Sequence, residues 1–172
     1  MLSPVPSNAV VIAAVAGSGG ASAALDLRTR RVPNWLTLGI TALGMTLAAA
    51  HVTDRSIAAA LGGFAVGLLL MLPGHIAGAT GAGDVKLFAA VGSLLGPAGI
   101  GAAFVYTAIV GGALALTVAM LRGRLHDTLQ ETATLVVTGG ANVARIERPS
   151  VDNRFAYAPA IALGTLVAAL GF

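Results

Sequence analysis

Long stretches without a charged residue alternate with short polar segments along the chain. No Asp, Glu, Lys or Arg occurs within 1–25, 32–53, 56–83, 87–121 or 155–172. A helix needs about 20 apolar residues to cross a bilayer, and these stretches lack the apolar–polar alternation of membrane β-strands. The pattern therefore predicts an all-α integral membrane protein.

The stretch 87–121 is too long for one crossing and contains Gly96-Pro97, a strong helix-breaking pair. Dividing it there leaves a short helix of twelve residues, which extends only about 18 Å against a hydrocarbon core of about 30 Å. We expect a single membrane domain over 1–172 with six transmembrane helices. Their expected ranges are about 8–26, 34–51, 56–73, 84–95, 98–121 and 155–171.

Polar and small residues mark the expected boundaries and contacts of these helices. Pro33 suits the first turn of the second helix, and Pro73-Gly74 is expected to end the third. Gly63 and Gly67 form a small-xxx-small pair, which indicates close helix packing. The polar segment 122–154 is expected to be the one sizeable loop outside the membrane.

The basic residues predict the orientation. With six crossings, Arg55 lies on one side and the other nine Lys and Arg residues lie on the opposite side, which the positive-inside rule identifies as cytoplasmic. A single crossing over 87–121 would leave the basic residues divided four to six. Both termini are therefore expected outside the cytoplasm. No Lys or Arg precedes the first apolar stretch, so we expect a retained helix and not a cleaved signal peptide.

Composition and charge exclude several classes of function. Hydrophobic residues make up 56% of the 172 residues and charged residues 10%, against about 25% charged in soluble domains. The net charge of +3 comes from basic residues spread over short loops, so no nucleic-acid partner is expected. The chain has no cysteine and its three histidines show no ligand spacing, so no metal site or cofactor is expected.

Two aspartates are the candidates for chemistry. Asp26 closes the first expected helix and Asp84 opens the fourth. Two crossings separate them, so both carboxylates are expected at the same membrane depth, where ionisable groups are usually functional. Two neighbouring carboxylates do not both ionise readily, so one can activate water while the other donates a proton. The structural alternatives are an ion pair of Asp26 with Arg28 or Arg30, and a capping role for Asp84.

The local sequences around these aspartates carry a family resemblance. Residues 26–34 read D-x-R-x-x-x-V-P-N, and residues 81–87 read G-x-G-D-x-K-L. Together, in this order and two helices apart, they resemble the motifs of prepilin peptidases, the membrane aspartic peptidases of type IV pilus systems. The segment 155–164 resembles the aromatic-Pro-small start of that family's last helix, so the resemblance covers about 25–171.

The resemblance implies an endopeptidase that removes the short basic leader of prepilin-type proteins at the cytoplasmic face of the inner membrane. It implies that Asp26 and Asp84 are the catalytic residues. Since the chain lacks the cysteine pairs of longer family members, it resembles the short, peptidase-only forms of Flp/Tad-type and preflagellin systems, and no methyltransferase activity is expected. Besides substrate and bilayer, no partner or oligomeric state is predicted.

The neighbouring motif residues are candidates for binding substrate or shaping the site. Gly81 and Gly83 permit backbone conformations and close approaches that other residues do not, or they form a plain loop. Lys86 either orients a substrate carboxylate or extends to the interface. Pro33 and Asn34 are expected to define the start of the second helix.

Two other classes of function remain open from the sequence. Paired membrane aspartates also suit a small transporter or channel that moves protons or cations. The chain could also be a noncatalytic inner-membrane subunit of a pilus or secretion system.

Overall fold

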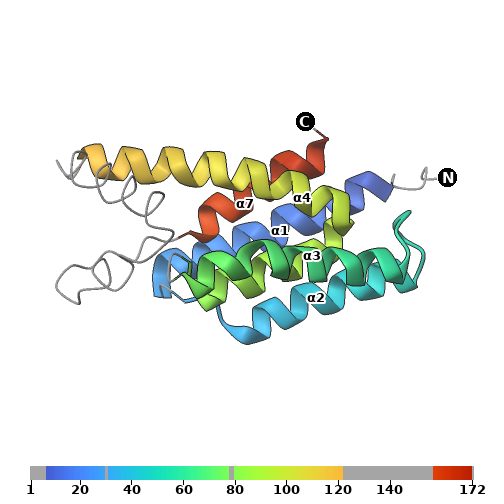
Figure 1. The fold of residues 1–172 in the computed structure, drawn as a ribbon. Helices are drawn as coiled ribbons and strands as arrows, with labels where there is room; N and C mark the ends of the chain where they lie inside the picture. Colours follow the sequence, from blue (N-terminus) through green and yellow to red (C-terminus); the bar gives the residue numbers. More distant parts are fainter. Residues whose placement is uncertain (1–6, 30, 78–79, 122–156, 172) are drawn as a thin grey trace.

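Apolar segments of this length form helices because only internal hydrogen bonds satisfy their backbone in lipid. The computed structural model describes residues 7–29, 31–77, 80–121 and 157–171. Figure 1 shows the helices, and no strand occurs among the described residues. The helices are α1 (Ser7–Thr29), α2 (Asn34–Ala49), α3 (Ile57–Ile76), α4 (Ala82–Leu121) and α7 (Ala158–Leu170). The predicted all-α class is confirmed.

The apolar helices are of membrane-spanning character. Three of them, α1, α3 and α4, contain segments that are long and apolar enough to cross a bilayer. The helices α2 and α7 are apolar but shorter, at 16 and 13 residues. Length and composition therefore identify a membrane protein.

The longest helix, α4, is broken in its interior. Gly96 has φ 73° and ψ 177°, a conformation that favours glycine, and Pro97 follows it. Figure 1 shows that α4 begins where α1 ends, reverses at the break, and returns to the same end of the molecule. We call its two parts the first arm (82–95) and the second arm (97–121).

Arg55 stabilises this break. A helix that stops leaves its last carbonyl groups without helical partners. The Nε of Arg55, from the connection between α2 and α3, donates a hydrogen bond of 3.0 Å to the carbonyl oxygen of Leu95. This basic residue, which sequence analysis placed apart from the other nine, therefore caps the first arm.

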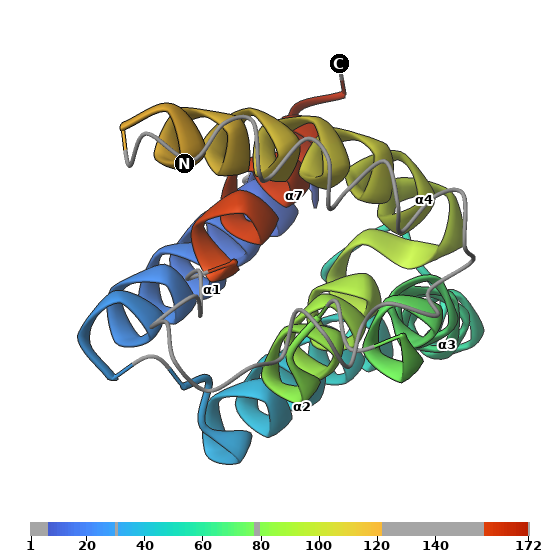
Figure 2. The same cartoon turned by 60° about the vertical axis from the view of Figure 1, so that its left-hand side comes forward.

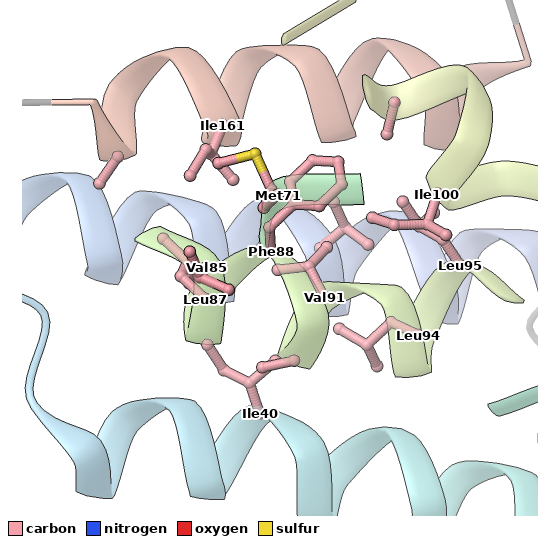
Figure 3. Packing of buried hydrophobic residues seen from close by; sticks show 14 of the residues in the cluster. Ile40, Met71, Val85, Leu87, Phe88, Val91, Leu94, Leu95, Ile100 and Ile161 are labelled. Carbon is pink, nitrogen blue, oxygen red and sulfur yellow. The ribbon is translucent and has the colours of Figure 1, made fainter. Parts of the chain in front are cut away.

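The first arm forms the centre of the core. Every residue from 87 to 96 is buried, and Figure 3 shows Phe88 and Val91 of this arm among Ile40, Met71 and Ile161 from three other helices. Because protein surrounds the arm, its length need not match the thickness of the lipid.

Small residues let the helices approach the first arm closely. A Cβ atom on Gly63 would overlap the carbonyl oxygen of Gly92, and one on Gly92 would overlap that of Gly63. A Cβ on Gly67 would lie 3.0 Å from Ala89 Cα. The predicted packing role of Gly63 and Gly67 is thereby confirmed.

Several helix ends differ from the expected ones. Helix α1 continues past Asp26 to Thr29, whose hydroxyl group bonds the carbonyl of Leu25. Helix α3 passes through Pro73 and ends at Ile76, because Pro removes one backbone donor without preventing the next turn, where the N–H of Ala77 bonds the carbonyl of Pro73. The predicted loop 122–154 and residues 155–156 lie outside the described residues.

Helix α7 lies between two other elements. Figure 2 shows it beside α1, with the second arm of α4 passing along its other side. A Cβ on Gly19 of α1 would lie 3.1 Å from Ala162 Cβ, and a Cβ on Gly164 would overlap Thr107 of the second arm. Helix α7 therefore packs between α1 and the second arm of α4.

Candidate active site

Asp26 is a buried carboxylate near the end of α1. Its side chain is 6% exposed. Its Oδ2 accepts a hydrogen bond of 3.2 Å from the backbone N–H of Ala158, the first residue of α7. A buried polar group requires such a partner, and here the partner comes from the other end of the sequence.

Asp84 lies in the first turn of α4 and is half-buried. Its backbone N–H donates a hydrogen bond of 3.1 Å to the carbonyl of Gly81. Its carboxyl group interacts electrostatically with Asp26. The end of α1 and the start of α4 lie at the same end of the molecule (Figure 1), so the structure brings the two aspartates together.

The structural alternatives for the two aspartates have different outcomes. Arg28 is exposed whereas Asp26 is buried against α7, and Arg30 lies outside the described residues. Asp84 is the third residue of α4, and the backbone N–H of Gly81, just before the helix, acts as a donor to its carboxylate. The capping alternative for Asp84 is therefore supported, and this contact coexists with the approach of Asp84 to Asp26.

The structure explains Gly81 and Gly83 by the room that a missing Cβ leaves beside them, and not by unusual backbone angles. Among the described glycines, only Gly96 and Gly171 have positive φ, so the expected conformational reason is wrong for Gly81 and Gly83. A Cβ on Gly81 would lie 3.1 Å from Oδ2 of Asp84, which is a tight contact. A Cβ on Gly83 would lie 3.4 Å from Val32 Cβ, an ordinary contact.

This difference predicts unequal effects of the two alanine substitutions. In the variant Gly81→Ala, the new methyl group displaces the Asp84 carboxylate, and we expect kcat for a reaction at this site to fall roughly tenfold, since misplacement by 1 Å costs about 100-fold. The matched variant Gly83→Ala should stay within about twofold. Steady-state kinetics of both purified variants provide the measurement. Equal effects would contradict the steric role of Gly81.

The remaining motif residues connect the two motifs to each other. The Nζ of Lys86 donates a hydrogen bond of 3.1 Å to Oδ1 of Asn34, and both side chains are exposed. Pro33 precedes α2 in an extended conformation, and its carbonyl accepts the N–H of Leu36. Lys86 therefore ties the start of α4 to the start of α2.

Sequence reasoning assigned no role to the start of α7. Tyr157 interacts electrostatically with Asp84, and Ala158 bonds Asp26. The signal was available, because the sixth expected helix starts on the same side of the membrane as Asp26 and Asp84. Among the described residues, no three or more His, Asp or Glu side chains are grouped to hold a metal ion.

Comparison with known proteins agrees with this geometry. Residues 9–116, more than half of the chain, match the type IV leader peptidase family, and the match includes both Asp26 and Asp84. Neither the curated proteins nor the solved structures gave a significant match. The helical membrane architecture, the paired aspartates and this match lead to one conclusion: the chain belongs to the type IV leader peptidase family, and it is a membrane peptidase of the leader-peptidase type.

Proposed function

We propose that the protein is an aspartic endopeptidase that cleaves the leader from prepilin-type substrates, with Asp26 and Asp84 as its catalytic residues. The observation that carries the proposal is the pairing of a buried Asp26 with Asp84 at one end of the bundle. Membership of a peptidase family makes hydrolysis of a peptide bond the reaction that such a pair serves.

In the proposed reaction, one aspartate starts ionised and the other protonated. The ionised carboxylate takes a proton from water as the water oxygen attacks the carbonyl carbon of the scissile bond, and the protonated one donates its proton to the carbonyl oxygen. The resulting gem-diol collapses when the first aspartate protonates the leaving nitrogen, the C–N bond breaks, and a gem-diol hydroxyl returns its proton to the second aspartate. Both aspartates then regain their starting states.

The position of the aspartates near the helix ends supports the proposed substrate class. A prepilin has a short basic leader followed by a hydrophobic helix, so its cleavage site lies where lipid meets water. Asp26 lies one turn before the end of α1 and Asp84 in the first turn of α4, which suits cleavage at such a boundary.

The proposed location is the cytoplasmic, or inner, membrane. We propose six crossings, with the first arm of α4 as the short one, and an active site that faces the cytoplasm. The support for this orientation is the excess of Lys and Arg at the ends of the helices that carry Asp26 and Asp84.

Transport receives less support from the described residues. A groove of about 380 Å³ opens between α1 and α2, and its lining is almost entirely apolar. The hydroxyl group of Ser18 in this groove bonds the carbonyls of Ala14 and Val15 in its own helix. The lining thus offers no charged side chain to a passing ion.

Coexpression with a candidate prepilin tests the proposal. We expect most of the prepilin to lose its leader in cells that contain the protein, seen as a faster-migrating band on a gel and as a new N-terminus by mass spectrometry. Cells with an empty vector are the control. Intact leaders on a panel of prepilins, despite normal accumulation of the protein in membranes, would contradict the proposal and favour a noncatalytic role.

A further inference from the structure

Helix α7 begins directly at the candidate active site. Its first N–H groups have no partners within the helix, and no side chain of Tyr157, the residue before the helix, caps them. The N–H of Ala158 instead donates to Oδ2 of Asp26 at 3.2 Å. Ala158 is fully buried, so water does not replace this contact.

This contact favours one of the two protonation states of Asp26, the ionised and the neutral. A backbone N–H only donates hydrogen bonds, so it stabilises a carboxylate more than a neutral carboxyl group. The positive end of the α7 dipole acts in the same direction. The bond therefore favours the form of Asp26 that accepts a proton from water.

Tyr157, the residue before this N–H, packs against a glycine of α4. Gly111 of the second arm is buried, and a Cβ there would lie 2.6 Å from Cε2 and 2.8 Å from the hydroxyl oxygen of Tyr157. The phenol ring therefore fits against the second arm only because residue 111 has no side chain. Tyr157 directly precedes Ala158, so its packing against Gly111 lies one residue from the N–H that bonds Asp26.

We propose that the start of α7 is a positioning element of the active site. The N–H of Ala158 holds Asp26 as the carboxylate that takes the proton from water, and Tyr157, seated against Gly111, positions that N–H. The role of Asp26 as the base rests on the proposed peptidase function, whereas the contact itself does not.

Among the described residues, other ionisable groups lie near the contact between Asp26 and Ala158. Asp84 approaches from α4, and Tyr157, directly before Ala158, interacts with Asp84. On α1 itself, Arg28 is exposed. Asp84 is present in every variant below, so comparisons between them report the contact from α7.

The contact can be measured without any activity. The chain has two tyrosines, and only Tyr157 precedes an alanine. Labelling with ¹³C-carbonyl tyrosine and ¹⁵N-alanine therefore yields a single amide signal, that of Ala158. We expect its proton shift to titrate with pH in the wild type, and the titration to disappear in Asp26→Asn. A shift that does not respond to pH, or responds equally in Asp26→Asn, would overturn the contact.

Kinetics test the positioning role. In Gly111→Ala, the new methyl group meets the far end of the Tyr157 ring, which can move, so we expect the variant to fold with the ring displaced. We expect kcat/KM for prepilin cleavage to fall about tenfold, and the acid limb of its pH profile to move to higher pH, because the lost bond had favoured the carboxylate. Gly112→Ala is the neighbouring control, since nothing lies within 4 Å of its added Cβ, and its profile should match the wild type.

A third variant separates positioning from general destabilisation. Gly164→Ala crowds Thr107 on the same α4–α7 interface, but six residues beyond Ala158 along α7. It should lower thermal stability without moving the acid limb. An unchanged acid limb in Gly111→Ala, or an equal shift in Gly164→Ala, would overturn the proposal. A wild-type protein that cleaves no prepilin would instead refute the peptidase function and leave the amide titration as the test of the contact.

Discussion

Cleavage of a prepilin is expected to stop when either Asp26 or Asp84 is replaced by asparagine. Each aspartate performs one of the two proton transfers at every step, and an amide can neither accept nor supply that proton. Loss of a single general acid or base costs about 100- to 10,000-fold. Both variants should therefore leave the leader uncleaved on a gel at times when the wild type has finished.

Asparagine is chosen because it preserves the packing of the site, so the comparison reports only the loss of the carboxyl group. The side-chain oxygen of Asn at position 26 still accepts the N–H of Ala158, so the contact with α7 is retained. Asp54 provides the control, because it lies in the connection between α2 and α3, at the other end of the bundle. Asp54→Asn should cleave normally at equal membrane levels. Near-normal cleavage by either Asp26→Asn or Asp84→Asn would refute the two-aspartate mechanism.

A large loss of stability is expected from Gly63→Ala. The added Cβ would overlap the backbone at Gly92 of the first arm and at Gly96 of the break, and backbone atoms cannot rotate away as a side chain can. Overpacking of this kind typically costs about 1–3 kcal/mol, occasionally more, and we expect the upper end of that range. The measurement is the thermal unfolding temperature of the purified protein in detergent.

Gly112→Ala is the matched control for this variant. It makes the same chemical change in a membrane helix, but at an exposed position with nothing within 4 Å of the new Cβ. Its unfolding temperature should stay close to that of the wild type or rise slightly, because alanine favours helix more than glycine does. A fall of equal size in both variants would show that the Gly63 contact does not limit stability.

Much of the architecture follows from the pattern of residues along the chain. The uncharged stretches predicted helices because a lipid environment leaves a backbone no other way to satisfy its polar groups. The same local reasoning failed at Pro73, where α3 continues to Ile76. A single proline weakens a helix by a finite amount, and whether the helix survives depends on the rest of the structure.

The candidate site, like the fold, was predictable from the sequence only in part. Counting helices between Asp26 and Asp84 predicted that they share one end of the bundle, and the two carboxyl groups do interact. Gly81 was expected to matter through backbone conformation or close approach, and the structure shows only the close approach. Its contact with the carboxylate of Asp84 depends on the direction of a side chain, and a glycine-rich motif alone does not specify that direction.

What the sequence determined by itself was the class of fold, the family and the identity of the paired aspartates, since each depends on residues close together in the chain or on the number of helices between them. The tertiary structure alone decided how the pair is held. Ala158 bonds Asp26 across 132 positions, and Lys86 bonds Asn34 across 52. Hydropathy specifies that helices pack together but not the rotation and depth at which they do so. Those are set by where glycines such as Gly63 and Gly111 let neighbouring elements approach, and that fit exists only once the helices are assembled.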